Sequence, residues 1–163
     1  MREDPDIIMI GELRDLETIH LALTAAETGH LVFATLHTSS AAQTVDRMID
    51  VFPPEDKSMI RTMLSNSLEA VISQRLLKKR DGSGRISAFE VLIATPAVRN
   101  LVREGKIPQI YSLMQVGSKA GMRVIKDSIF ALMNEGVISS EVAKSALNTV
   151  DDTTKPSNAA GGF

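Results

Sequence analysis

One acidic residue, Glu12, stands just after a short aliphatic run near the start of the chain. The run, Ile7–Ile10, ends at Gly11, and its unbroken apolarity predicts a strand covered on both faces in a parallel sheet. Ligands of open α/β sheets bind beyond the carboxyl ends of the strands, where a carboxylate is suited to holding Mg²⁺ or positioning a water beside a nucleotide. The spacing alone fits a helix-capping or surface acid as well, so both interpretations of Glu12 stay open on this ground.

A histidine, His37, follows a second apolar run in the same way. The run Leu31–Leu36 predicts another buried strand, and the polar stretch Thr38–Ser40 comes directly after the histidine. If the two strands are parallel, their ends open on one crevice, where His37 can donate a hydrogen bond to a terminal phosphate and report its loss. A lone histidine is more commonly structural, and we interpret His20 and His30 as structural or surface residues.

The elements that must position these two side chains alternate between strands and helices. Asp15 is suited to cap a helix that Gly29 ends, so a helix is expected between the two apolar runs. Ser39 or Ser40 can cap a further helix over about Ala41–Ile49. The order strand, helix, strand, helix predicts an α/β sheet with crossover helices.

The second half of the chain changes character. A long helical pattern runs from after Pro54 to about Ile72, and strand-like pieces near 72–77 and 85–93 flank turn residues, which predicts a hairpin. Thr95 is placed to cap a helix that has Pro96 at its first position. Further helices are expected over about 108–115 and 122–134, and a last one capped by Ser139 or Ser140 and ending near 147.

Composition excludes several classes of protein. The 163 residues fit one domain, or one domain with a small appendage, and a net charge of −2 gives no basic field to attract nucleic acid. The chain has no cysteine, which excludes disulfides and thiolate zinc sites. Its aliphatic runs are far shorter than the roughly 20 residues that span a bilayer. We therefore expect a cytoplasmic protein, peripheral to a membrane at most through a partner, and its abrupt start suggests part of a longer protein.

The stretch around Glu12 resembles a known nucleotide-site motif. From Arg2 to Asp15 the chain reads Arg-x-x-Pro-Asp, an aliphatic run and Gly-Glu-x-Arg-Asp, and this resembles the Walker B signature of the type II/IV secretion ATPase superfamily. The resemblance implies that Glu12 is the catalytic glutamate that orients or activates the attacking water. The stretch 35–41 resembles the superfamily's His box, which implies that His37 binds nucleotide and senses the γ-phosphate.

A third stretch, 95–104, resembles the motif Ala-Ile-Arg-Asn-Leu-Ile-Arg-Glu of the type IV pilus retraction ATPases, the PilT family. This resemblance implies that an exposed set of side chains serves retraction separately from nucleotide chemistry. The set comprises Arg99, Asn100, Arg103 and Glu104. Composition alone fits an amphipathic helix with a charged outer face equally. The lack of cysteine agrees with the resemblance, because extension and secretion relatives typically carry a cysteine-bound zinc element in this half.

The resemblance covers about Arg2 to Leu147 and implies a fold and a function. The expected fold is α/β: part of a RecA-like P-loop NTPase core, the Walker B half, over 1–94, then a small helical C-terminal subdomain over 95–148. The polar tail, 149–163, is expected to be disordered. The implied function is ATP hydrolysis with Mg²⁺ by a hexameric ring that retracts type IV pili in twitching motility, docked on an inner-membrane platform protein. No metal site made by the chain's own residues is expected.

The string Gly-x-x-x-x-Gly-Lys-Ser/Thr does not occur in the 163 residues. In P-loop ATPases its backbone amides cradle the phosphates, and the resemblance places it upstream of Met1 with an acidic box, arginine fingers and a PAS-like domain. We therefore expect the isolated chain to be inactive. The alternatives are a non-catalytic docking module of the pilus machinery and part of a related secretion or conjugation ATPase. The sequence leaves two roles open for Arg14, which either contacts nucleotide or pairs with Asp15 or Glu17.

Overall fold

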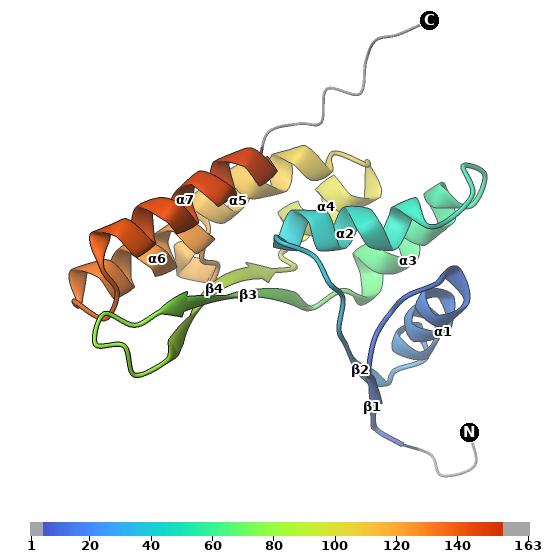
Figure 1. Ribbon diagram of the computed structural model, residues 1–163. Helices are drawn as coiled ribbons and strands as arrows, with labels where there is room; N and C mark the ends of the chain where they lie inside the picture. Colours follow the sequence, from blue (N-terminus) through green and yellow to red (C-terminus); the bar gives the residue numbers. More distant parts are fainter. Residues whose placement is uncertain (1–4, 155–163) are drawn as a thin grey trace, which may run out of the picture.

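The computed structural model describes residues 5–154, whose elements are shown in Figure 1. They follow in the order β1 (Ile7–Ile10), α1 (Leu16–Glu27), β2 (Leu31–Ala34), α2 (Ala41–Asp50), α3 (Lys57–Ser67), β3 (Ala70–Lys78), β4 (Arg85–Ile93), α4 (Pro96–Arg103), η1 (Ile107–Gln109), α5 (Ile110–Val116), η2 (Ser118–Ala120), α6 (Ile125–Asn134) and α7 (Ser140–Thr154). The predicted alternation of strands and helices in the first part, the hairpin and the later helices are confirmed.

The two N-terminal strands form a parallel pair, as predicted. Ile7 pairs with Leu31 and Ile10 with Ala34, and α1 makes the crossover between the strands. Asp15 begins this helix as predicted: its carboxylate accepts the backbone N–H of Thr18 at 2.8 Å. The carboxyl ends of β1 and β2 therefore lie at the same edge of the pair.

The prediction that both faces of these strands are covered is wrong for the part of the chain that the structure describes. Ile10 and Val32 pack against the main hydrophobic cluster. On the strands' other side, Ile7, Met9 and Phe33 keep 60%, 77% and 55% of their surface exposed. The unbroken apolar run makes both faces of the strands hydrophobic, but the described residues cover only one of these faces.

The helix expected to run on to about Ile72 ends earlier. α3 stops at Ser67, Leu68 is extended with ψ of 128°, and β3 starts at Ala70. The apolar residues after Ser67 have helical spacing, but Ile72 pairs with Val91 of β4 instead. Antiparallel pairing along the whole hairpin overrides the local helical pattern here.

The hairpin β3–β4 runs from the middle of the molecule to its lower left edge in Figure 1, with α6 and α7 over it. Two hydrophobic clusters meet on it. Leu92 belongs to a cluster with residues of α1 to α5, and Leu77 and Ala88 belong to a second cluster with α6 and α7. α4 and α5 thus share a core with α2 and α3, and the boundary at residue 94 stays a sequence-based prediction.

The predicted start of the disordered tail, residue 149, is too early in the chain. α7 continues through Thr149 to Thr154 instead of ending near Leu147. Val150 is only 2% exposed in the second cluster, and the Thr149 hydroxyl donates to the carbonyl of Ser145 at 3.0 Å. The prediction followed the polar composition of this stretch and did not account for Val150, which lies in helical register with Ala143 and Ala146. The rest of the predicted tail, 155–163, lies outside the described residues. Within 5–154, no helix has the length and apolarity needed to cross a membrane.

Candidate functional site

The segments that follow β1 and β2 are tied together beyond the ends of the strands. The backbone N–H of Leu13 donates to the carbonyl of Thr35 at 2.9 Å. The Thr35 hydroxyl donates to the carbonyl of Gly11. These bonds continue the parallel register past the strands, so Glu12 and His37 project from the same edge, as the sequence predicts.

Glu12 is held between two basic side chains. Its Oε2 atom accepts from Nε and Nη2 of Arg14, each at 2.5 Å, and its Oε1 atom lies 3.5 Å from Nε2 of His37. The Glu12 side chain is 24% exposed, against 77% for Arg14 and 83% for His37. Arg14 therefore pairs with Glu12. It does not pair with Asp15 or Glu17, the two partners that the sequence suggested. Because Nε and Nη2 of Arg14 both contact Oε2, Oε1 is the less engaged oxygen.

His37 stands where two hollows in the surface meet. One, of about 680 Å³, lies along the start of α2 and is also lined by Ser39 and Gln43. The other, of about 450 Å³, lies between the end of β2 and β3 and is also lined by Thr35 and Ser73. An exposed imidazole between two hollows has room to meet a ligand that approaches from solvent.

The residues at this edge fit one end of a nucleotide. A carboxylate, an imidazole and the Thr38 hydroxyl are the groups that position water and hydrogen-bond to phosphate oxygens. Residues 5–150 contain no group of three His, Cys, Asp or Glu side chains that could hold a metal ion. Mg²⁺ at nucleotide sites is commonly held by one or two carboxylates together with phosphate oxygens and waters. Glu12 could take part in such a shared coordination.

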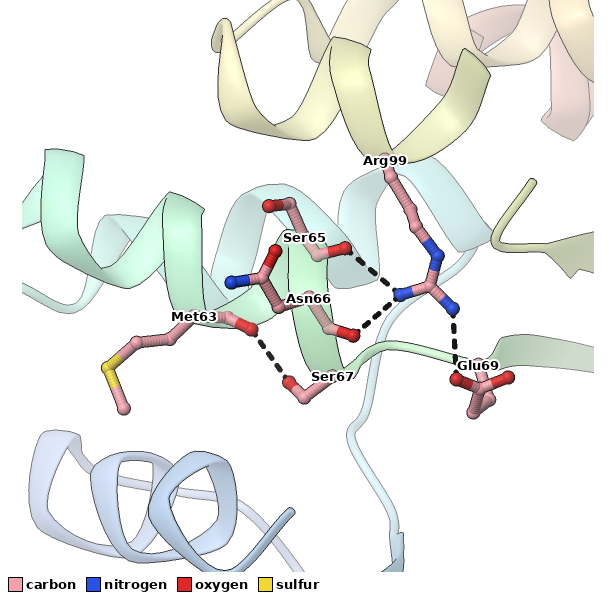
Figure 2. A network of polar contacts seen from close by, with 6 residues as sticks. All are labelled: Met63, Ser65, Asn66, Ser67, Glu69 and Arg99. Carbon is pink, nitrogen blue, oxygen red and sulfur yellow. Dashed lines mark hydrogen bonds and ion pairs between the residues drawn. The ribbon is translucent and has the colours of Figure 1, made fainter. Parts of the chain in front are cut away.

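The predicted retraction motif divides into one packed residue and three exposed ones. Arg99 reaches from α4 to the end of α3, as Figure 2 shows. Its Nη1 atom donates to the carbonyls of Ser65 and Asn66 at 3.0 and 2.8 Å, and its Nη2 atom donates to Glu69 at 2.9 Å. The last carbonyls of a helix lack intrahelical donors, so Arg99 caps α3.

The other three residues of the motif make weaker or purely local contacts. Arg103 approaches the side-chain oxygen of Asn66 at 3.4 Å, and Asn100 donates to Glu104 at 2.9 Å one turn along α4. Hydrogen bonds from Lys106 and Asn100 hold the pKa of Glu104 below its ordinary value. The motif therefore contacts the end of α3, Glu69 and Lys106, and the structure does not bring it together with Glu12 and His37.

A buried acid that sequence reasoning missed lies on the hairpin. Glu90 of β4 is only 2% exposed, and its carboxylate accepts the backbone N–H of Ala41 at 2.7 Å and that of Ile125 at 3.4 Å. The available signal was an acidic residue within an otherwise apolar strand, Ala88–Ile93. Such a residue is buried only when partners satisfy it.

The chain is similar in sequence and in fold to known proteins. Residues 1–144 match the family model "Type II/IV secretion system protein". The chain is 60% identical over 144 residues to the "Twitching motility protein" of Neisseria gonorrhoeae, covering 88% of this chain and 38% of the relative. It is also 60% identical over 144 residues to the "Type IV pilus retractation ATPase PilT" of Pseudomonas aeruginosa, covering 88% and 42%.

Solved structures match as well. A crystal structure of the pilus retraction motor PilT with bound ADP superposes with a TM-score of 0.80 at 49% identity, over 89% of this chain and 40% of that one. The Legionella pneumophila ATPase DotB gives 0.79 at 31% identity, over 91% and 40%. The chain thus spans about two fifths of the length of these relatives and holds a corresponding part of their RecA-like fold. It belongs to the type II/IV secretion system protein family and is similar over most of its length to the retraction ATPase PilT.

Proposed function

We propose that this chain is the C-terminal part of a hexameric ATPase that hydrolyses ATP to retract type IV pili. The observation that carries the proposal is the meeting of Glu12 with His37 at the carboxyl ends of two parallel strands. Open α/β sheets bind their ligands at this place. The PilT structure that the chain resembles was solved with ADP, which supports nucleotide as the ligand.

The geometry suggests a division of roles. Arg14 engages Oε2 of Glu12 and so orients the carboxylate, while Oε1 lies 3.5 Å from Nε2 of His37. In the proposed reaction Glu12 positions the attacking water and accepts its proton, and His37 donates a hydrogen bond to the terminal phosphate. When bound, Mg²⁺ would neutralise the charge that develops on the phosphate oxygens.

The proposal makes this chain an incomplete site when it is alone. The phosphate-binding loop and arginine fingers would come from a segment that precedes these residues in the longer protein. The isolated chain is therefore expected not to hydrolyse ATP. In the assembled hexamer the ring would stand on the cytoplasmic side of the inner membrane, peripheral to it, and engage the pilus platform protein.

Retraction is favoured over secretion by the degree of similarity. The chain is 60% identical to the Pseudomonas aeruginosa retraction ATPase, but 35% identical over 78% of its length to the type II secretion protein HxcR of the same organism. The motif residues Arg99, Asn100, Arg103 and Glu104 agree with this choice.

A hybrid protein tests the proposal. The matching 144 residues of the Pseudomonas aeruginosa retraction ATPase are replaced by those of this chain, and this hybrid ATPase is expressed in a strain that lacks the native enzyme. We expect twitching motility to return. Glu12→Gln should abolish it, whereas Glu17→Gln, a matched change at an exposed acid in the first turn of α1, should not.

Two results would overturn the proposal in different ways. A hybrid ATPase that hydrolyses ATP at normal protein levels without restoring motility would assign the chain to another machine of the family. A Glu12→Gln variant that restores motility fully would make the segment a docking module without a catalytic carboxylate.

A further inference from the structure

The buried carboxylate of Glu90 serves two helices at once. Its Oε1 atom accepts the backbone N–H of Ala41, the first residue of α2, at 2.7 Å. Its Oε2 atom accepts the backbone N–H of Ile125, the first residue of α6, at 3.4 Å. One side chain on β4 thus joins the N-termini of two helices that belong to different hydrophobic clusters.

Only a carboxylate can make this pair of contacts. The first amides of a helix lack intrahelical acceptors and carry partial positive charge, so they stabilise an anion. A glutamine at this position would offer one carbonyl oxygen and an NH₂ group, and the NH₂ group cannot accept from a backbone N–H. A neutral isostere would therefore leave one of the two helix ends without its acceptor.

The helix end at Ala41 carries the segment that holds His37. Ser40 caps α2 by accepting the N–H of Gln43 at 3.2 Å. Arg75 of β3 approaches the carbonyl of Ser39 at 3.5 Å. The stretch between His37 and α2 is thus held from the hairpin at two points, by Arg75 and by Glu90.

The helix end at Ile125 is fastened to the same strand. The Ser128 hydroxyl of α6 accepts the N–H of Phe89 at 3.0 Å, and Ser128 is 3% exposed. Arg123 and Val91 exchange backbone hydrogen bonds at 2.8 and 2.9 Å. Contacts on both sides of Glu90 along β4 therefore fix where α6 starts.

We propose that Glu90 is a positioning residue that couples α6 to the His37 segment. Because its two oxygens hold the starts of α2 and α6, a displacement of α6 is transmitted to the stretch that places His37 beside Glu12. The coupling of these segments involves only residues of this chain, so it does not depend on the proposed function. Its consequence for hydrolysis rests on the proposed function of His37.

Hydrogen exchange measured by NMR on this chain tests the double contact. In the unmodified chain the amides of Ala41 and Ile125 should exchange about tenfold or more slowly than that of Leu16, the first residue of α1, because a buried acceptor holds them. This comparison needs no variant. Equal exchange at the three first-turn positions would overturn the proposal.

The Glu90→Gln variant tests the coupling. We expect exchange at Ala41 or Ile125 to rise about tenfold and the ring resonances of His37 to shift. The matched control, Glu55→Gln at an exposed acid between α2 and α3, should change neither. A folded Glu90→Gln chain with both amides and the His37 ring unchanged would overturn the proposal.

A second substitution separates coupling from mere stability. Ser128→Ala removes a hydrogen bond at the start of α6. It should shift the ring resonances of His37 in the chain that carries Glu90, and it should not shift them in the Glu90→Gln chain. Equal shifts in both backgrounds would contradict the coupling. These readouts need no nucleotide, so they can succeed even if the hybrid ATPase fails to hydrolyse ATP, and the two failures are distinguishable.

Discussion

The Nε2 atom of His37 lies 3.5 Å from Oε1 of Glu12, although one residue follows β2 and the other follows β1. The parallel register and the hydrogen bond from Leu13 to Thr35 produce this meeting. The pair is therefore a product of sheet topology, and its surroundings lead to specific expectations.

Arg14 should affect hydrolysis far more than folding. Its Nε and Nη2 atoms both contact Oε2 of Glu12, but the Arg14 side chain is 77% exposed, and exposed ion pairs contribute only about 0–1 kcal/mol. Arg14→Ala should leave the free energy of unfolding of this chain within about 1 kcal/mol in urea titration. It should lower hydrolysis by the hybrid ATPase about tenfold or more through misplacement of the carboxylate. Unchanged hydrolysis would show that Arg14 does not orient Glu12.

Arg99 should be the residue of the retraction motif that stabilises the fold. Arg99→Ala removes three hydrogen bonds at the end of α3 and should lower the free energy of unfolding by about 1–3 kcal/mol. Arg103→Ala removes one long contact and should cost less than about 0.5 kcal/mol. Urea titration of both variants decides, and equal losses would contradict the capping role of Arg99.

Arg103 should separate hydrolysis from retraction. The residue is exposed on α4 and does not contact Glu12 or His37 in any hydrogen bond of the described chain. Arg103→Ala in the hybrid ATPase should keep hydrolysis within about twofold while twitching motility is lost. Lys119→Ala, an exposed basic residue of η2, is the control that should keep both. Parallel loss of hydrolysis and motility would place Arg103 in the nucleotide chemistry instead.

Ionisation of Asp15 should make the free energy of unfolding depend on pH in the acidic range. Hydrogen bonds from the backbone N–H and the hydroxyl of Thr18 hold the pKa of Asp15 below its ordinary value of 3.8. A carboxyl with a lowered folded-state pKa stabilises the fold above its unfolded pKa, and this contribution is lost as pH falls through the folded value.

Asp15→Asn keeps a good helix cap and removes the charge that titrates. The variant should stay close to the unmodified chain at neutral pH and lose less stability as pH falls from about 5 to below 3.8. Thermal unfolding across this range is the measurement. Identical pH profiles for the two proteins would show that the capping bond does not bias the ionisation of Asp15.

Local sequence patterns were sufficient for much of the fold, whereas the choice of Glu12 and His37 as site residues also needed the resemblance to known motifs. Asp15 and Thr95 begin their helices as their residue types predict, since a short side chain that accepts an N–H bond works through contacts within one turn. The placement of Glu12 and His37 at one edge could be predicted because parallel strands bring their carboxyl ends together.

Other features depend on contacts between distant segments and could not be read locally. The spacing of Leu68 and Ile72 fits a helix, and only pairing with β4 makes this stretch a strand. Arg99 looked like part of an outer charged face, but it caps a helix that lies far from it in the sequence. Glu90 required knowledge that two helix ends converge on one strand.

The most direct test of the account is the rate of ATP hydrolysis by the purified hybrid ATPase with and without Glu12→Gln. The account predicts measurable hydrolysis by the unmodified hybrid and a loss of about 100-fold or more in Glu12→Gln, because the water would lose its base. Glu17→Gln should retain the full rate. Hydrolysis by Glu12→Gln equal to that of the unmodified hybrid would contradict the assignment of this strand edge as the catalytic half-site.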